Sequence, residues 1–157
     1  MGDDRLNFGP AEVLAALPQK EPFRFLDEIV ELGPASIVCQ KTFHEDEFFF
    51  QGHYPGEPIV PGVILCEAGM QAGAALLASM LAGDSAAGMG PGVPVATRMN
   101  DVKFKKVIRP GDVIQLEVRL KERLAQAFFL QVSIRCEGKL AARFEFGCTM
   151  AEMETAP

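Results

Sequence analysis

The sequence predicts an α+β fold in which an antiparallel sheet wraps around one long central helix. One apolar stretch, residues 63–83, is long enough for such a helix, and four segments with strand character follow it. Short turn signals separate those four segments, which favours antiparallel neighbours. A helix that is apolar on all sides is normally enclosed by other elements, and a sheet can enclose it.

The N-terminal third supplies a short helix, two strands and a loop. Residues 10–17 have helical apolar spacing, with Pro10 at the start and Pro18 as the stop. Residues 25–32 and 36–43 are typical of strands, and Gly33-Pro34 supplies the turn between them. Residues 44–61 contain three prolines and two glycines, which indicates a largely irregular loop.

The long helix begins after Pro61 and ends near residues 82–83, where a Gly- and Ala-rich loop runs to about residue 94. We expect strands over residues 95–107, 113–123, 128–136 and 139–153, with turns at 109–112 and 137–138. Neither a repeat nor a linker interrupts the pattern, so we expect one domain over residues 1–157 with its core at about 10–153. The edges of such a sheet invite pairing with a second copy.

Composition and charge narrow the function classes. The chain has 157 residues, of which 48% are hydrophobic and 23% charged, as in an ordinary globular protein. A net charge of −6 argues against a nucleic-acid partner, because phosphate binding needs clustered Lys and Arg. Residues 63–83 are apolar enough to suggest a membrane span, but Glu67, Gln71 and the lack of aromatic belts favour a core helix.

The four cysteines are far apart and have neither metal-site spacing nor the density of a disulfide scaffold, so we expect buried free thiols and no metal. The N-terminal segment begins with acidic residues and has no apolar stretch typical of a signal peptide. A reducing, cytoplasmic setting is the expectation that follows.

Three polar side chains near the head of the long helix are candidates for chemistry. His53 lies between two glycines, in a loop stiffened by prolines, and histidine is the side chain best suited to proton transfer near neutral pH. Glu67 lies in an otherwise apolar helix, where burial is costly and raises the pKa of a carboxyl group toward that of a general acid. Gln71 follows four residues later on the same face, within reach of that carboxyl group.

The start of the helix adds hydrogen-bond donors to the candidate base His53 and the candidate acid Glu67. Pro61 presets the helical backbone, and Gly62 lets a ligand approach the free N–H groups of the first turn. Those donors and the helix dipole can hold a carbonyl oxygen that gains negative charge. A base, an acid and an anion cradle thus fall within 15 residues, and elimination of water β to a thioester carbonyl needs these three parts.

The segment HYPGEPIVPGVILCEAGMQ, residues 53–71, resembles the active-site motif of the FabZ-type 3-hydroxyacyl-acyl-carrier-protein dehydratases, roughly HFPxxPxxPGVLxxExxxQ. Residues 17–23 (LPQKEPF) are similar to that family's LPHRYPF segment. Residues 101–112 (DVKFKKVIRPGD) are similar to its VKFRRPVxPGD strand and turn. The resemblance covers roughly residues 12–150.

The resemblance implies a hotdog fold and a role for each matching residue. His53 would take the proton from the α-carbon, and Glu67 would protonate the leaving 3-hydroxyl with the help of Gln71. The N–H groups of Gly62 and Val63 would hold the thioester carbonyl. The family also implies a homodimer, commonly a trimer of dimers, whose sites pair the histidine of one subunit with the glutamate of the other. No metal or organic cofactor is implied.

The implied partner is acyl carrier protein, with the acyl chain on its phosphopantetheine. Phe48, Phe49 and Phe50 are candidates to line the acyl tunnel. Carrier proteins are acidic, so the basic residues Lys103, Lys105, Lys106 and Arg109 are either a docking patch or a solvated strand face.

The sequence departs from the family pattern at Gln19 and Glu21, which replace His and Tyr, at Tyr54, which replaces Phe, and in a long loop at 83–93. Glutamate at position 67 favours the dehydratase type over the dehydratase-isomerase relatives. The alternatives are a hotdog thioesterase, an enoyl-CoA hydratase and a non-catalytic subunit that binds acyl chains.

Overall fold

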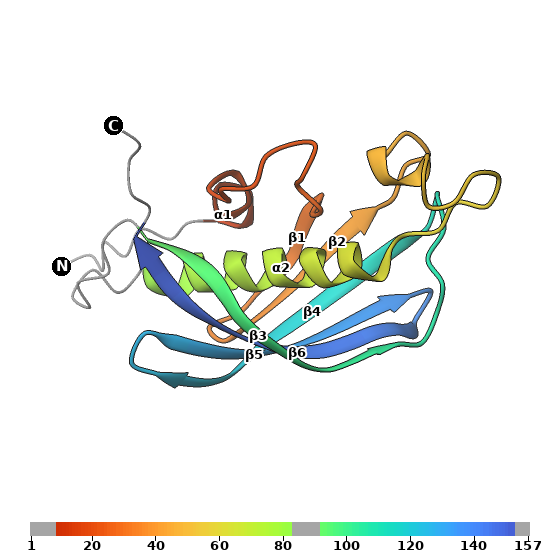
Figure 1. Ribbon diagram of the computed structural model, residues 1–157. Helices are drawn as coiled ribbons and strands as arrows, with labels where there is room; N and C mark the ends of the chain where they lie inside the picture. Colours follow the sequence, from red (N-terminus) through yellow and green to blue (C-terminus); the bar gives the residue numbers. More distant parts are fainter. Residues whose placement is uncertain (1–8, 83–91, 153–157) are drawn as a thin grey trace.

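One long helix, α2 (Gly62–Ala82), lies against a six-stranded antiparallel sheet that curves around it (Figure 1). The structure is a computed structural model that describes residues 9–82 and 92–152. The predicted α+β architecture, with an antiparallel sheet around one central helix, is confirmed. Most of the Gly- and Ala-rich loop expected after the helix lies outside the described residues.

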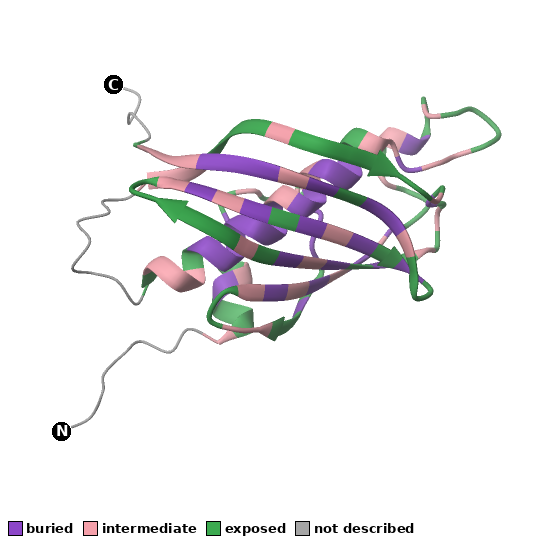
Figure 2. Cartoon of the chain, turned by 90° about the horizontal axis from the view of Figure 1, so that it is seen from below, coloured by how far each residue is buried: buried purple, intermediate pink, exposed green. Residues whose placement is uncertain are grey.

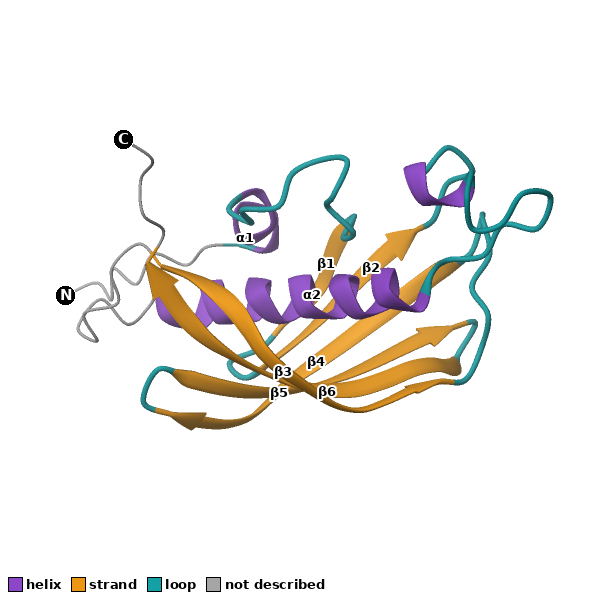
Figure 3. Ribbon diagram, in the orientation of Figure 1, coloured by secondary structure: helices purple, strands orange, loops and turns teal. Residues whose placement is uncertain are grey.

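The remaining elements follow the predicted order (Figure 3). The helices are α1 (Pro10–Ala15) and a short 3₁₀ helix, η1 (Phe48–Phe50), within the loop that was expected to be irregular. The strands are β1 (Glu28–Leu32), β2 (Ser36–Thr42), β3 (Gly92–Phe104), β4 (Val113–Leu124), β5 (Ala127–Cys136) and β6 (Lys139–Glu152).

The predicted bounds of two strands were wrong. β1 begins at Glu28 rather than at residue 25, because the Phe25 N–H donates to a side chain of α2 instead of to a neighbouring strand. β3 begins and ends three residues earlier than expected. Its start pairs with the end of β6, from Gly92 opposite Glu152, and its end is displaced because Lys105 and Lys106 both donate to the Ala141 carbonyl.

The strand order is β1-β2-β4-β5-β6-β3, so β1 and β3 are the two edges. β1 has only 5 residues, whereas β3 has 13 and is largely exposed. A long exposed edge carries unpaired N–H and C=O groups and favours pairing with another strand. The sheet therefore has one edge suited to assembly, and it is β3.

The core forms where the inner face of the sheet meets α2. Buried residues alternate with partly buried or exposed ones along β5 and in the middle of β6, as expected for strands with one face toward a core (Figure 2). Small residues on α2 permit close contact: a Cβ added at Gly73 would lie 2.6 Å from Cζ of Phe146. Close packing of this kind leaves no room for a larger side chain.

α2 is the one described helix that is long and apolar enough to cross a membrane, and 61% of its most apolar window is buried inside the protein. The sheet covers it along its length (Figure 1). This arrangement matches the prediction of a core helix.

Candidate active site

His53 is held in one tautomer by the backbone of its own loop. Its Nδ1 lies 3.0 Å from the Ile59 carbonyl oxygen, and the Ile59 N–H donates to the His53 carbonyl at 3.0 Å. A carbonyl oxygen only accepts, so Nδ1 must carry the proton, and Nε2 of the neutral ring keeps its lone pair. The ring also stacks on Tyr54, with 4.1 Å between centroids. This arrangement leaves Nε2 as the atom able to take a proton.

A buried lysine anchors the start of the same loop. Lys41, on β2, is only 4% exposed, and its Nζ lies 2.8 Å from Oε1 of Glu47 and 3.6 Å from Oδ1 of Asp27. The second oxygen of Glu47 accepts the His44 N–H at 3.1 Å. Glu47 immediately precedes η1, so this ion pair fixes where the loop leaves the sheet.

We expect Lys41→Ala to lower the free energy of unfolding by about 3 kcal/mol, because it leaves the Glu47 carboxylate without its buried partner. Urea unfolding followed by circular dichroism measures the change. The control is Lys121→Ala, which removes a solvent-exposed pair with Glu145 and should cost less than about 1 kcal/mol. Equal losses in the two variants would contradict the assignment of Lys41 as a buried anchor.

Glu67 and Gln71 form the polar pair that the sequence predicted. The Gln71 Nε2 donates to Oε1 of Glu67 at 3.1 Å and to the Phe23 carbonyl at 2.8 Å. The Gln71 Oε1 accepts the Phe25 N–H at 2.8 Å. Gln71 is fully buried, and these three bonds allow only one orientation of its amide. Glu67 is half-buried in the single chain rather than fully buried as expected.

The first turn of α2 has unused donors beside an apolar hollow. The N–H groups of Gly62 and Val63 donate no hydrogen bond within the described part of the chain, and the Val63 side chain is 74% exposed. The hollow has a volume of about 550 Å³ and includes Ile59 and Phe104 among its lining residues. A Cβ at Gly62 would lie 2.8 Å from Cζ of Phe104, so a larger residue there would have to displace the Phe104 ring. These donors can hold a developing oxyanion next to an apolar chain.

A second, smaller cavity of about 100 Å³ adjoins Glu67 and Gln71, and it is not lined by His53. Residues of α2, β3 and β6 line it together with Gln19, from the segment after α1. No hydrogen bond connects His53 to Glu67 among the described residues. Ile59, whose carbonyl binds His53, lines the hollow at the helix head, whereas Glu67 and Gln71 line the smaller cavity, so the single chain presents two separate candidate half-sites.

Sequence reasoning missed Gln19 as a site residue and treated it only as a departure from a motif. Its side-chain oxygen is buried and has no hydrogen-bond partner among the residues that the structure describes. Its backbone carbonyl accepts a hydrogen bond from Nε of Arg24 at 3.1 Å, which holds the segment in place. No local sequence pattern marks Gln19, because it comes close to Glu67 only through the cavity that it shares with α2 in the folded chain.

The cysteines are buried free thiols, as predicted. Cys148 lines the small cavity, but burial raises its pKa to about 11, so it is a neutral thiol and a poor nucleophile at neutral pH. Among the residues that the structure describes, no group of three His, Cys, Asp or Glu side chains could hold a metal ion.

The aromatic run before His53 forms a cluster of phenylalanine rings and lines neither of these two cavities. Phe49 makes edge-to-face contacts with Phe25, Phe43, Phe48 and Phe50, at centroid distances of 4.7 to 6.2 Å. Phe50 is buried, and Phe48 is exposed. The Phe25 N–H also donates to Gln71, so this cluster adjoins the half-site that contains Glu67.

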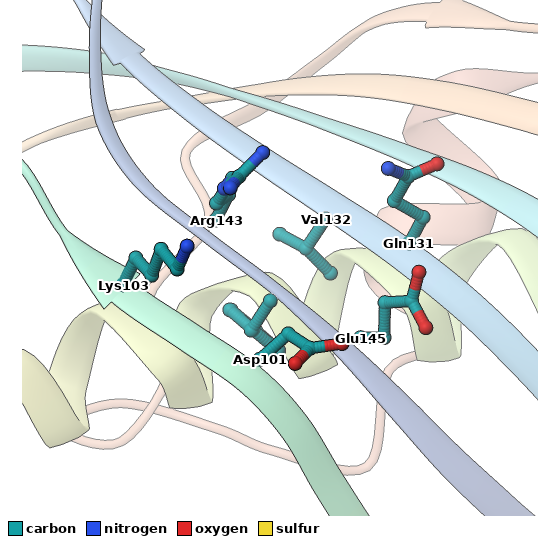
Figure 4. A pocket seen from close by; sticks show the side chains of 7 residues that line it. Asp101, Lys103, Gln131, Val132, Arg143 and Glu145 are labelled. Carbon is teal, nitrogen blue, oxygen red and sulfur yellow. The ribbon is translucent and has the colours of Figure 1, made fainter.

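The basic residues expected to form one cluster divide into two groups. Lys105 and Lys106 border the apolar hollow at the head of α2. Lys103 instead lines a separate hollow of about 310 Å³ with Asp101, Arg143 and Glu145, on the face of the sheet turned away from α2 (Figure 4). Only the first group lies beside the candidate cradle.

Comparison with known proteins gives one consistent family. Residues 17–145 match the model of the FabA-like domain. The 3-hydroxyacyl-[acyl-carrier-protein] dehydratase FabZ of Syntrophobacter fumaroxidans is 37% identical, over 89% of this chain and 92% of that protein. The FabZ of Burkholderia thailandensis is 31% identical, over 100% of this chain and 97% of that protein.

Solved structures with the same fold are more distant in sequence. The dehydratase heterocomplex ApeI:P from Xenorhabdus doucetiae aligns with a TM-score of 0.69 at 14% identity, covering 92% of this chain and 93% of that one. The smu.793 protein from Streptococcus mutans, bound to acetyl CoA, aligns with a TM-score of 0.64 at 12% identity, covering 89% and 99%.

Proposed function

The chain belongs to the FabA-like family and is a 3-hydroxyacyl-[acyl-carrier-protein] dehydratase of fatty acid biosynthesis, and we propose that His53 and Glu67 carry out its elimination of water. The observation that carries this proposal is the fixed tautomer of His53, which leaves Nε2 free to accept a proton. The predicted enzyme class and the resemblance stated from the motif are both confirmed by the relatives.

In the proposed reaction, His53 Nε2 removes a proton from the α-carbon of a (3R)-hydroxyacyl thioester. The negative charge that moves onto the thioester oxygen is stabilised by the N–H groups of Gly62 and Val63 and by the helix dipole. Glu67 protonates the 3-hydroxyl as the C3–O bond breaks, and water and a trans-2-enoyl thioester leave. Gln71 is a positioning residue, since its amide holds the carboxyl group of Glu67.

The two half-sites favour a catalytic dimer formed through β3. The cavity beside Glu67 includes Pro94 and Ala96, near the start of β3, whereas the hollow at the helix head includes Phe104, at its end. If two copies pair antiparallel along this edge, the start of one β3 lies beside the end of the other. Glu67 of one subunit would then approach His53 of its partner. A trimer of such dimers remains part of the proposal.

The carrier protein is proposed to approach the head of α2. Lys105 is exposed and lines the apolar hollow, and an acidic carrier would be attracted to it. The hollow itself suits the apolar acyl chain. We place the enzyme in the cytoplasm, in line with its four reduced cysteines.

We expect Lys105→Glu to raise KM for a carrier-bound substrate about tenfold, with kcat nearly unchanged, because it weakens the attraction to an acidic partner. Steady-state kinetics with the same acyl chain on pantetheine, which lacks the protein, should show no such increase. Lys121→Glu, at an exposed position of β4 that lines neither the hollow nor the cavity beside Glu67, is the matched charge control. A KM increase of equal size with the pantetheine thioester would contradict carrier docking at this place.

The substrate assignment is tested by following the conjugated enoyl thioester formed from a panel of 3-hydroxyacyl chains, each presented on carrier protein and on coenzyme A. Reversible dehydration that is fastest on carrier protein supports the proposal. Release of free thiol without enoyl formation would identify a thioesterase, and a preference for coenzyme A would identify a hydratase; either result overturns it. Binding without turnover would overturn it as well.

A further inference from the structure

Gln19 is an unexplained polar group beside the proposed acid. Its side-chain oxygen is buried and accepts no hydrogen bond within the described residues. It lines the same cavity of about 100 Å³ as Glu67 and Gln71, and the other lining side chains are apolar or sulfur-containing. The cavity therefore holds three polar side chains from two separate segments of the chain.

An unpaired buried acceptor is costly. It loses its bonds to water on folding and gains no replacement, which costs on the order of 1–3 kcal/mol. The neighbouring Gln71 gives the contrast, because both polar atoms of its side-chain amide have hydrogen-bond partners. Gln19 is also held firmly, since Arg24 donates to its carbonyl and to that of Leu17. A fixed but unsatisfied acceptor at a reactive carboxyl group is suited to a ligand.

We propose that Gln19 is a further substrate-binding catalytic residue, whose side-chain oxygen accepts the hydrogen of the substrate's 3-hydroxyl group. This inference rests on the proposed role of Glu67. The hydroxyl oxygen is the atom that must be protonated, and it then directs a lone pair toward Glu67. When the C3–O bond breaks, that oxygen takes the bonding electrons and the proton from Glu67. It leaves as water, still bonded to Gln19, while His53 holds the proton from the α-carbon.

The cavity matches this role in size and polarity. A volume of about 100 Å³ accommodates a hydroxyl group and the water it becomes, but not an acyl chain. Glu67 supplies the donor, Gln71 orients that donor, and Gln19 supplies the acceptor. The apolar surroundings, including Phe146 and Met70, strengthen both hydrogen bonds by excluding bulk water.

The test separates a ligand-binding role from a structural one through stability. Gln19→Met keeps the length of the side chain and removes the orphan acceptor. We expect its urea midpoint to equal or exceed that of the wild type, while kcat/KM falls about tenfold. Gln131→Met, at an exposed position on β5, is the matched control and should change neither quantity. A loss of stability that accompanies the loss of activity, or unchanged activity, would overturn the proposal.

A binding measurement makes the result independent of turnover. In the His53→Ala background, titration calorimetry compares 3-hydroxydecanoyl-pantetheine with decanoyl-pantetheine. We expect Gln19→Met to reduce the preference for the hydroxylated chain about tenfold, with little effect on the saturated one. An equal loss for both chains would overturn the assignment. If instead His53→Ala alone keeps wild-type turnover, the proposed function fails, and that failure is seen before Gln19 is changed.

Discussion

Replacing His53 with alanine is expected to lower kcat for dehydration about a thousandfold, because it removes the proposed proton acceptor, whose ring is bonded to Ile59 at the edge of the hollow. Such a loss corresponds to about 4 kcal/mol of transition-state stabilisation. KM should change little, since the N–H donors of Gly62 and Val63 and the apolar hollow remain. Steady-state kinetics on a carrier-bound 3-hydroxyacyl chain measures the effect.

The chain supplies a matched control, because it contains only two histidines. His44 lies on the same loop and is exposed, and its hydrogen bonds with Glu47 use its backbone N–H and carbonyl rather than the ring. His44→Ala should keep both kcat and the free energy of unfolding close to the wild type. Comparable losses of kcat in the two variants would show that the loop, and not the imidazole of His53, is what the reaction needs.

The tautomer behind this prediction explains what sequence reasoning could and could not reach. The pair Glu67–Gln71 follows from helix periodicity alone, since residues four apart share a face. The bond from His53 to the Ile59 carbonyl arises from the path of an irregular loop, and no periodic rule gives that path. The motif predicts the residue, and the structure shows which of its ring nitrogens the loop backbone holds.

Lys41 and Gln19 illustrate a second limit. A lysine on a strand is normally expected at the surface, but the carboxylates of Glu47 and Asp27 stabilise it in the interior. Gln19 follows a short helix and has no local pattern that marks it. Neither position is marked by a periodic pattern: Lys41 is explained by its carboxylate partners, and Gln19 by an unsatisfied oxygen in a cavity shared with distant segments.

The strand boundaries differ for a related reason. The predicted start of β1 included Phe25, whose alternation with neighbouring residues fits a strand. Its N–H is instead taken by Gln71, a residue 46 positions away in sequence, so the tertiary contact overrides the local pattern. The same bond fixes the wall of the cavity beside Glu67. The predicted start of β1 is therefore wrong at the place where the chain contacts the candidate site through Gln71.

Mixing two inactive variants, His53→Ala and Glu67→Gln, is expected to restore activity to about a quarter of the wild-type level. If each site takes His53 from one subunit and Glu67 from the other, a mixed dimer has one intact site and one site that lacks both groups. Random exchange makes about half of the dimers mixed, and each of these carries half the normal number of sites. Co-expression of differently tagged chains, followed by purification on both tags, isolates the mixed dimers, which should reach about half of the wild-type kcat.

The control uses two variants of the same residue, His53→Ala and His53→Asn, whose mixed dimers contain no intact site and should stay inactive. Recovery in the first mixture without recovery in the second can come only from a site shared between subunits. Activity that stays absent in both mixtures, with dimers demonstrated by sedimentation, would place both groups of each site within one chain. That outcome would require the His53 loop to move toward α2, because in the single chain no hydrogen bond joins His53 to Glu67 and the cavity beside Glu67 is not lined by His53.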